Sequence, residues 1–328
     1  MNTTWKTFLL DQQTLADDEN RVAFADTANF SENSIYPLTH LAVLSVTGKD
    51  AAKLLQGQIT CNVNDISETK SSLAAMCNPK GRAIATFLLV KKADAFLLIL
   101  PVELLETVKK RLQMYVLRSD VKITDGSDEF CLLGLCEPEN TVQAFSTLIH
   151  QDIISVNFLG LTSRKLLLTN VENAMRLWTE QVDSKGFRTG SSNEWLYLDI
   201  VSGIPWVTMA TSEEFVPQML NLDKLGGISF NKGCYTGQEI VARMHYLGKS
   251  KREMFLAECQ TSTLPEPNSS IVNKDSAEQE VVGKVLLAQL DGQSCKMLVV
   301  LQTTESDYNN LGLQDDMQAQ IKLLPFNV

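Results

Sequence analysis

Residues 225–239 read LGGISFNKGCYTGQE, and this stretch decides the local fold around the candidate site. Four of its fifteen residues are glycine, which predicts a loop whose backbone adopts unusual φ angles and approaches a neighbouring group closely. The stretch ends in Thr236-x-x-Glu239, the pattern of a capping box, and apolar residues then recur at helical spacing. We therefore expect a glycine-rich loop followed by a helix that ends at Gly248.

Cys234 lies just before this expected helix and two residues from Lys232. The N–H groups of a helix N-terminus and a nearby ammonium both favour the thiolate, which is the nucleophilic form of cysteine. The same pattern also fits a structural turn with a half-buried cysteine, and the spacing identifies no partner base. Both interpretations stay open on the residues alone.

The segment 232–252 carries a local positive charge. Its charged residues are Lys232, Arg243, Lys249, Lys251 and Arg252 against Glu239, which gives a net charge of +4. A basic patch beside a glycine-rich turn suits an anion, such as the glutamate tail of a folate or an RNA phosphate. A solvated helix end is the simpler interpretation of the same residues.

The chain as a whole is acidic. It has 328 residues, of which 29 are Lys or Arg and 39 are Asp or Glu, so its formal net charge is −10. Such a surface repels nucleic acid and anionic lipid on average, so any RNA contact is expected to be local or indirect. The apolar share of 44% is typical of a globular protein, and the longest apolar runs fall short of a membrane span. The first residues lack an export signal, and we expect a cytoplasmic protein without membrane partners.

The cysteines and histidines show no metal-binding pattern. Seven cysteines occur without C-x-x-C spacing, and the three histidines lie far apart in the sequence. We therefore predict no metal site, and we expect most of the cysteines to be reduced and buried.

Strand and helix patterns alternate over the first 250 residues. They predict strands at 41–46, 84–90, 95–100, 129–135, 153–158 and 165–169, and helices at 49–56, 103–117, 141–149 and 172–183. The last part of the chain predicts short strands alone, at 253–259, 281–289, 295–302 and 317–323. The expected class is α+β, with a first unit over 1–120, a second over 121–248 that can exchange segments with it, and a small β-barrel over 249–328.

The sequence KGCYTGQE at 232–239, preceded by NLDKLGGISF and followed by IVAR, closely resembles the signature of the YgfZ family. Further matching stretches are TGKDAAKLLQGQITCNV at 47–63, MCNPKGR at 76–82, EWLYLDIVSGIP at 194–205 and EFVPQMLNLDKLGGISF at 214–230. The resemblance implies a folate-binding protein that is associated with tRNA modification and linked to iron–sulfur cluster assembly or repair. The fold it implies is that of the glycine-cleavage aminomethyltransferase, with two α+β units and a C-terminal β-barrel around a central folate pocket.

The resemblance also assigns residues to the site. The motif residues are Lys232, Gly233, Cys234, Tyr235, Thr236, Gly237, Gln238 and Glu239, followed by Arg243. We expect Cys234 to be the reactive thiol and Lys232 its electrostatic neighbour. Thr236 and Glu239 are expected to cap the helix, and Tyr235, Gln238 and Arg243 are expected at the folate pocket.

Two tryptophans are associated with folate binding in the family. One matches Trp195, whereas the other aligns with Leu41 in this chain. Leucine offers only apolar contact to a pterin, which is worth roughly 0.5–1.5 kcal/mol less than an aromatic pair. The resemblance implies tetrahydrofolate or a derivative as cofactor, although Trp195 also fits a role in core packing.

The related transferases carry a paired aspartate where this chain has Ala85 and Thr86. Without a carboxylate there, acid–base or charge-stabilising work on a folate is not supported, which favours a protein that is not an enzyme. The resemblance thus implies an accessory protein that sustains iron–sulfur enzymes such as tRNA methylthiotransferases and affects tRNA indirectly. The alternatives are a folate-dependent one-carbon transferase acting on an amine or RNA, a direct tRNA-binding module, and a structural scaffold.

Overall fold

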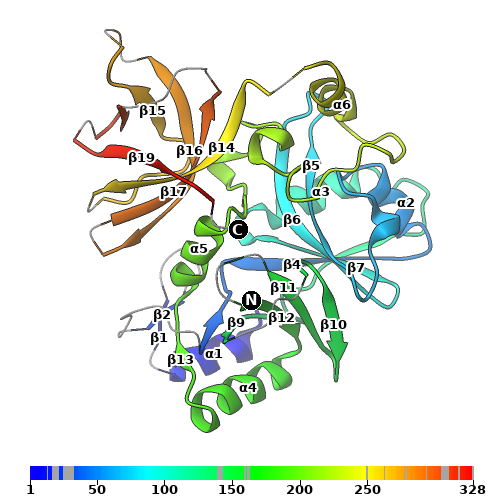
Figure 1. Ribbon diagram of the computed structural model, residues 1–328. Coiled ribbons are helices and arrows are strands. Elements are labelled where there is room, and N and C mark those ends of the chain that lie inside the picture. The colour runs from blue at the N-terminus through cyan, green and yellow to red at the C-terminus, as the bar shows by residue number, and fades with distance from the viewer. Residues whose placement is uncertain are drawn as a thin grey trace. The chain divides into compact units, whose positions relative to one another are not determined.

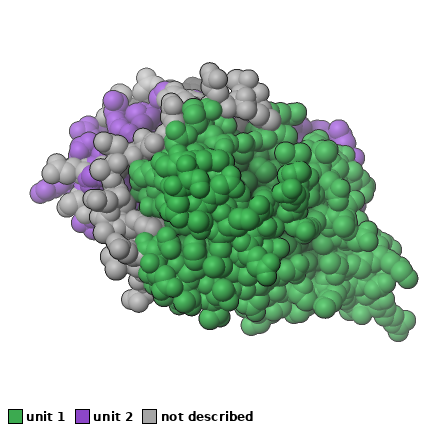
Figure 2. Space-filling view, turned by 90° about the horizontal axis from the view of Figure 1, so that it is seen from below, with its two compact units in different colours: residues 1–55, 63–72, 87–196 green, residues 56–62, 73–86, 197–328 purple. Residues whose placement is uncertain are grey.

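The computed structural model of the protein describes residues 1–12, 14–16, 22–24, 33–138, 143–158, 160, 163–248, 250–261, 263–276, 278, 280–292, 294–303, 310–316 and 318–326. The chain forms two compact units, each assembled from three separate stretches. The first contains 1–55, 63–72 and 87–196, and the second contains 56–62, 73–86 and 197–328 (Figure 2). The three consecutive domains expected from the sequence stay a prediction.

A six-stranded sheet organises the first unit, in the order β10-β11-β12-β9-β3-β13 (Figure 1). Its strands are β3 (Ser34–Pro37), β9 (Cys131–Glu137), β10 (Thr147–His150), β11 (Ile153–Phe158), β12 (Ser163–Thr169) and β13 (Arg188–Thr189). Neighbouring strands are antiparallel, except that β13 runs parallel to β3. A separate antiparallel pair joins β1 (Thr14–Ala16) and β2 (Val22–Phe24).

The two faces of this sheet are covered differently, because successive side chains of a strand point to opposite faces. Leu133 of β9 packs in a hydrophobic cluster with Trp5 of α1 (Thr3–Asp11) and Trp178 of α4 (Val171–Thr179). The two tryptophan rings meet edge to face at 6.1 Å. The next residue, Gly134, faces the other way, and a Cβ atom there would lie 2.3 Å from the ring of Trp195 in α5 (Ser192–Val201).

A second antiparallel sheet of the first unit contains β6 (Ala83–Lys92, in this unit from residue 87), β7 (Ala95–Pro101), β4 (Leu41–Thr47) and β8 (Lys122–Asp125), in that order. The hairpin predicted between β6 and β7 is confirmed, with Lys92 paired to Ala95. The predicted helix 103–117 is shorter in the structure. A 3-10 turn (Val102–Leu104) leads into α3 (Leu105–Gln113). The apolar residues after it, Met114 and Leu117, are 59% and 88% exposed. The helix ends there because these side chains do not pack in a core.

The helix predicted at 141–149 is wrong. Residues 141 and 142 lie outside the described residues, and Thr147–His150 form β10, an edge strand paired with β11. Local apolar spacing was therefore overridden by strand pairing, which the sequence pattern does not reveal. The other helices of this unit are α2 (Ala51–Gln56), the short turn Val63–Asp65, and a π-helical turn at Glu180–Ser184 that extends α4.

The second unit contains a closed six-stranded β-barrel, in the order β14-β17-β16-β15-β18-β19. Its strands are β14 (Arg252–Gln260), β15 (Ser270–Asn273), β16 (Val281–Asp291), β17 (Ser294–Gln302), β18 (Leu311–Leu313) and β19 (Gln320–Leu324). Alternate residues of β17 fill its core, among them Met297, Val299 and Leu301. The predicted barrel is confirmed; Met317, expected to start the last strand, lies outside the described residues.

The remaining elements of the second unit are β5 (Ser72–Cys77, in this unit from residue 73), two 3-10 turns at Met209–Thr211 and Pro217–Leu220 (η5), and α6 (Gln238–Leu247). The start of β6 and the end of α5 also belong to it. None of the helices in the described part of the chain has the length and apolar character needed to cross a bilayer.

We expect Gly134→Ala to destabilise the protein, because the new Cβ would meet the Trp195 ring at 2.3 Å in a packed core. Overpacking of this kind costs typically about 1–3 kcal/mol. Urea unfolding followed by circular dichroism measures the change. Gly248→Ala is the control, since a Cβ at that position meets nothing within 4 Å; equal stability of the two variants would contradict the packing described here.

Candidate functional site

The motif loop, defined here as residues 232–237, leads directly into α6. The helix begins at Gln238 and its N-cap is Gly237, whose φ of 83° lies in the left-handed region. No side chain caps the helix, so the predicted capping box of Thr236 and Glu239 is wrong. Glycine takes this conformation without steric cost. The N-cap of the helix is therefore Gly237, one residue later than the Thr236 that the sequence pattern suggested. The predicted end of the helix at Gly248 is confirmed.

Lys232 fastens the start of the motif loop to the segment 57–61. Its ammonium donates hydrogen bonds to the backbone carbonyls of Ile59 and Cys61, at 2.8 and 2.7 Å. The Nζ atom also lies 5.0 Å from the centre of the Tyr235 ring, within range of a cation–π contact. The cation expected to act on Cys234 is thus engaged in holding the loop.

Thr236 fastens the other end of the loop to the same segment. Its backbone N–H donates to the carbonyl of Gly57 at 3.2 Å, and its hydroxyl donates to Oε1 of Gln58 at 3.2 Å. Thr60, which is fully buried, donates its hydroxyl to the carbonyl of Gly227 at 2.7 Å and accepts from the N–H of Ala75 at 2.9 Å. The segment 57–61 therefore joins the glycine-rich stretch to β5.

A tight turn supports the loop from another side. In residues 76–82, the side-chain oxygen of Asn78 accepts from the N–H groups of Lys80 and Arg82, at 2.9 and 3.0 Å. A Cβ on Gly237 would lie 2.5 Å from the Asn78 carbonyl and 2.9 Å from the Cα of Gly81. Only glycine permits this approach of two backbones, so two stretches far apart in the sequence meet here.

Cys234 is exposed, as is Gly233 before it, whereas the other six cysteines are buried. Its neighbour Tyr235 points inward and is 7% exposed. The N–H of Tyr235 donates to Oε1 of Gln238 at 3.3 Å. The Gln238 side chain therefore binds the backbone of the motif loop. The loop thus presents one thiol to solvent from a well-anchored backbone.

Burial shifts the pKa values of the groups beneath the loop. It lowers the pKa of Lys232 to about 8, against a smaller opposite effect of Cys61. It raises the pKa of Tyr235, with a further contribution from Cys77, and raises the pKa of the Cys77 thiol to about 12. Both buried groups therefore stay protonated near neutral pH, whereas Lys232 is the group closest to exchanging a proton.

Ala85 and Thr86 lie in β6 and are 0% and 1% exposed. The Thr86 hydroxyl donates to the carbonyl of Pro205 at 2.5 Å and accepts from the N–H of Val207 at 2.9 Å. The hydroxyl is thus fully used in holding the segment 205–207 against the strand. Ala85 thus serves packing, Thr86 binds the backbone of the neighbouring segment, and neither side chain carries a carboxylate.

Trp195, the expected folate contact, is 0% exposed and belongs to the first unit. The guanidinium of Arg164 lies 4.9 Å from its ring centre, and the rings of Tyr36 and Phe158 lie at 5.6 and 6.1 Å. Among the described residues its indole N–H has no hydrogen-bond acceptor. The ring is covered by neighbours in this arrangement and does not offer a pterin a free face.

Leu41, the other expected contact, begins β4 and is 6% exposed. It lines a cavity of about 20 Å³ together with Trp5 and Phe130. That volume holds about one water molecule. Leu41 and Trp195 are thus both buried here, and their expected contact with a folate stays a prediction.

Arg243 points outward from α6 and forms an ion pair with Glu239 at 2.8 Å, one helical turn away. Both side chains are mostly exposed, so the pair adds little stability. Lys249, part of the expected basic patch, lies outside the described residues. Within the described ranges, no group of three or more His, Cys, Asp or Glu residues is arranged to hold a metal ion.

Comparison with known proteins agrees with this description. The model of the GCVT N-terminal domain matches residues 27–176. The tRNA-modifying protein YgfZ of Colwellia psychrerythraea is 33% identical over 288 residues, which cover 84% of this chain and 87% of that protein. The chain belongs to the YgfZ family. The family inferred from the KGCYTGQE motif is therefore confirmed.

The solved structure of the glycine cleavage system aminomethyltransferase T from Bartonella henselae has the same fold. It superimposes with a TM-score of 0.70 and 12% identity, covering 88% of this chain and 83% of that one. The predicted aminomethyltransferase-like fold is thus confirmed, together with its C-terminal barrel. At this identity the likeness concerns the fold alone.

Three residues that shape the site escaped the sequence analysis: Gln58, Thr60 and Asn78. All three lie in stretches noted only for resemblance. Each has a partner more than 100 residues away in the sequence, and Asn78 also holds a local turn. An Asn two residues before Lys80-Gly81 is a recognisable turn signal that could have identified Asn78.

We expect the stability of the wild type relative to Lys232→Met to rise as the pH increases from about 8 towards the ordinary lysine value of 10.5. In that range the unfolded chain keeps a proton on Lys232 that the folded protein has released, so higher pH favours folding. Urea unfolding at several pH values measures the difference, with Lys251→Met at an exposed lysine as control. A difference that falls with pH would contradict the lowered pKa.

Proposed function

We propose that the protein takes part in tRNA modification as a cytoplasmic, folate-binding accessory protein that sustains iron–sulfur enzymes such as tRNA methylthiotransferases. Its effect on tRNA is indirect, and Cys234 is its reactive group. The proposal is supported by membership of the YgfZ family, in which the Colwellia protein is named as tRNA-modifying. The net charge of −10 also favours an indirect effect on tRNA.

The observation that carries the proposal is the presentation of Cys234. The loop that bears it is fastened by Lys232 at its start and by Thr236 at its end, and the turn at Gly81 abuts Gly237. Loops with so many specific anchors are expected where a side chain must be presented precisely. The one exposed thiol of the protein occupies that loop.

An accessory role is favoured over one-carbon transfer. The aligned positions hold Ala85 and Thr86, which are buried, and the Thr86 hydroxyl is committed to two backbone groups. Neither residue can accept a proton from a substrate or stabilise a developing positive charge. The folate part of the proposal is supported by membership of the YgfZ family and by the match to the GCVT N-terminal domain.

We expect Cys234→Ser to fail in complementing cells that lack this protein. The readout is the amount of methylthiolated tRNA nucleosides measured by mass spectrometry, which should stay at the level of the deletion strain. Because Cys234 is exposed, its replacement should change stability by less than about 0.5 kcal/mol, which thermal unfolding of the purified variant checks.

The matched control is Asn231→Ser, an exposed position just before the motif loop, which should complement fully. Full rescue by Cys234→Ser would remove the thiol from the mechanism and leave it a surface residue.

We expect the purified protein to bind a reduced folate such as 5-formyltetrahydrofolate, as measured by titration calorimetry. Because Trp195 is a core residue here, Trp195→Phe should lower the stability of the protein while leaving the affinity for folate unchanged. Absence of binding by the wild type up to about 1 mM would remove the folate part of the proposal. Loss of binding in the folded variant would show that the ring contacts the pterin.

A further inference from the structure

Two buried cysteines of the barrel lie directly opposite each other. Cys259 of β14 and Cys295 of β17 are partners in the antiparallel register, which runs without a shift along both strands. Opposite residues of such a ladder share a face, and both side chains belong to the core of the barrel, where they are 2% and 0% exposed. None of the proposed roles uses these two residues, which we call the cysteine pair.

The distance between the two backbones suits a disulfide. Hydrogen-bonded and non-hydrogen-bonded residue pairs alternate along an antiparallel ladder. The Thr303 N–H donates to the Lys251 carbonyl at 2.8 Å, which makes those two residues a hydrogen-bonded pair. The cysteine pair lies an even number of residues further along the same register, so it is of the same kind, with Cα atoms about 5.5 Å apart. Disulfides most often join Cα atoms about 5.5–6 Å apart.

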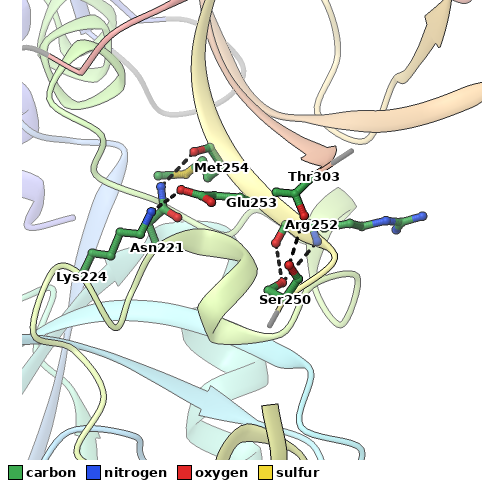
Figure 3. A network of polar contacts seen from close by, with 7 residues as sticks. All are labelled: Asn221, Lys224, Ser250, Arg252, Glu253, Met254 and Thr303. Carbon is green, nitrogen blue, oxygen red and sulfur yellow. Dashed lines mark hydrogen bonds and ion pairs between the residues drawn. The ribbon is translucent and has the colours of Figure 1, made fainter. Parts of the chain in front are cut away.

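Contacts at both ends fix the register of this ladder. At one end the Thr303 hydroxyl, just after β17, donates at 3.1 Å to the carbonyl of Ser250, just before β14, within a polar network (Figure 3). At the other end Glu258 and Lys296, which precede and follow the two cysteines, form an ion pair across the strands. A slip by one residue would turn the side chains of one strand to the opposite face, so these contacts keep the two thiols together.

The two thiols interact with each other. The Cys295 thiol donates a hydrogen bond to the Cys259 sulfur, which lowers the pKa of Cys259 and raises the pKa of Cys295. Burial and Asp316 oppose the effect on Cys259. The Lys296 carbonyl, 3.7 Å from the Cys295 sulfur, is a second acceptor for the same hydrogen. Cys259 is therefore the member that more readily becomes a thiolate, which is the nucleophilic form.

The cysteine pair lies near the end of its ladder. Cys259 is the next-to-last residue of β14, and Cys295 is the second residue of β17. The ends of elements open locally at a lower free energy than their centres, which gives small molecules access to groups that are buried in the closed state. Burial therefore slows the oxidation of the pair without preventing it.

We propose that the cysteine pair is a site of reversible oxidation, at which a peroxide forms a disulfide between β14 and β17 and a dithiol reduces it again. The shared face, the opposed positions in the register and the contact between the sulfurs support this assignment. The proposal is independent of the proposed function, because it uses neither the motif loop nor a folate.

The oxidation proceeds in two steps. The Cys259 sulfur attacks the O–O bond of hydrogen peroxide, so that an S–O bond forms, the O–O bond breaks, and one oxygen leaves as water with the thiol proton. The Cys295 sulfur then attacks the sulfenic acid on Cys259, the S–S bond forms, and the second oxygen leaves as water with the Cys295 proton. The two sulfurs are oxidised and the peroxide oxygens are reduced. A dithiol reverses the result by thiol–disulfide exchange and becomes a disulfide itself.

Peptide mapping of the full-length Cys234→Ser protein tests the site, because this variant lacks the exposed thiol. The folded protein is treated with hydrogen peroxide, unfolded in the presence of iodoacetamide and digested without reductant. Trypsin releases Cys259 in the peptide 253–274 and Cys295 in the peptide 285–296, each with a single cysteine. We expect these two peptides to be recovered joined to each other, and their alkylated forms to be lost.

Two other buried cysteines provide the internal control. Cys131 faces Thr169 and Cys136 faces Ser34 across their strands, so neither has a thiol opposite it. Both should be recovered alkylated. Cys295→Ala should abolish the joined peptides, whereas Cys136→Ala should leave their yield unchanged. The oxidised Cys234→Ser protein should also unfold at a higher urea concentration than its reduced form, since a cross-link restricts the unfolded chain.

Three outcomes would overturn the proposal. The first is recovery of both peptides in alkylated form after a treatment that fully oxidises glutathione in a parallel sample. The second is a joined product that forms only when urea is present during the peroxide treatment, because the folded barrel would then not hold the thiols within reach. The third is a joined product that dithiothreitol does not separate in the folded protein, which would contradict reversible oxidation.

Discussion

The hydrogen bonds from the Lys232 ammonium to the carbonyls of Ile59 and Cys61, at 2.8 and 2.7 Å, hold the motif loop in place. They bring together residues more than 170 positions apart in the sequence. An ammonium has three donors and no acceptor, so it is suited to gathering backbone carbonyls that would otherwise lack partners. The arrangement partly buries the charged ammonium, and this burial lowers the pKa of Lys232.

The position of Cys234 follows from these contacts. A glycine-rich loop with no anchors would sample many conformations, because glycine loses more conformational freedom on folding than any other residue. Here the loop is bound at Lys232 and Thr236 and its floor is formed by Tyr235. The thiol is exposed, while hydrogen bonds on both sides of it hold the backbone that carries it.

The sequence was sufficient for the features that depend on local pattern. The loop, the helix after it, the hairpin of β6 and β7 and four of the six barrel strands follow from composition and periodicity, and the KGCYTGQE motif identified the family. The short strands β15 and β18 of the barrel were not predicted. The sequence was insufficient for features that tertiary contacts determine. The helix begins at Gln238 because Gly237 meets a distant turn, and Thr147–His150 form a strand because β11 lies beside them. The partners of Lys232 and Thr60 are backbone groups, which no residue pattern marks.

The contact between Gly237 and the turn at Asn78 has a consequence for how this protein can evolve. A Cβ on Gly237 would meet the carbonyl oxygen of Asn78 and the Cα of Gly81, which are backbone atoms common to all residues. A steric conflict with a side chain can be relieved by a smaller side chain opposite, but a conflict with the backbone cannot. Gly237 therefore has no compensating second site, and any lineage that keeps this loop against this turn must keep the glycine.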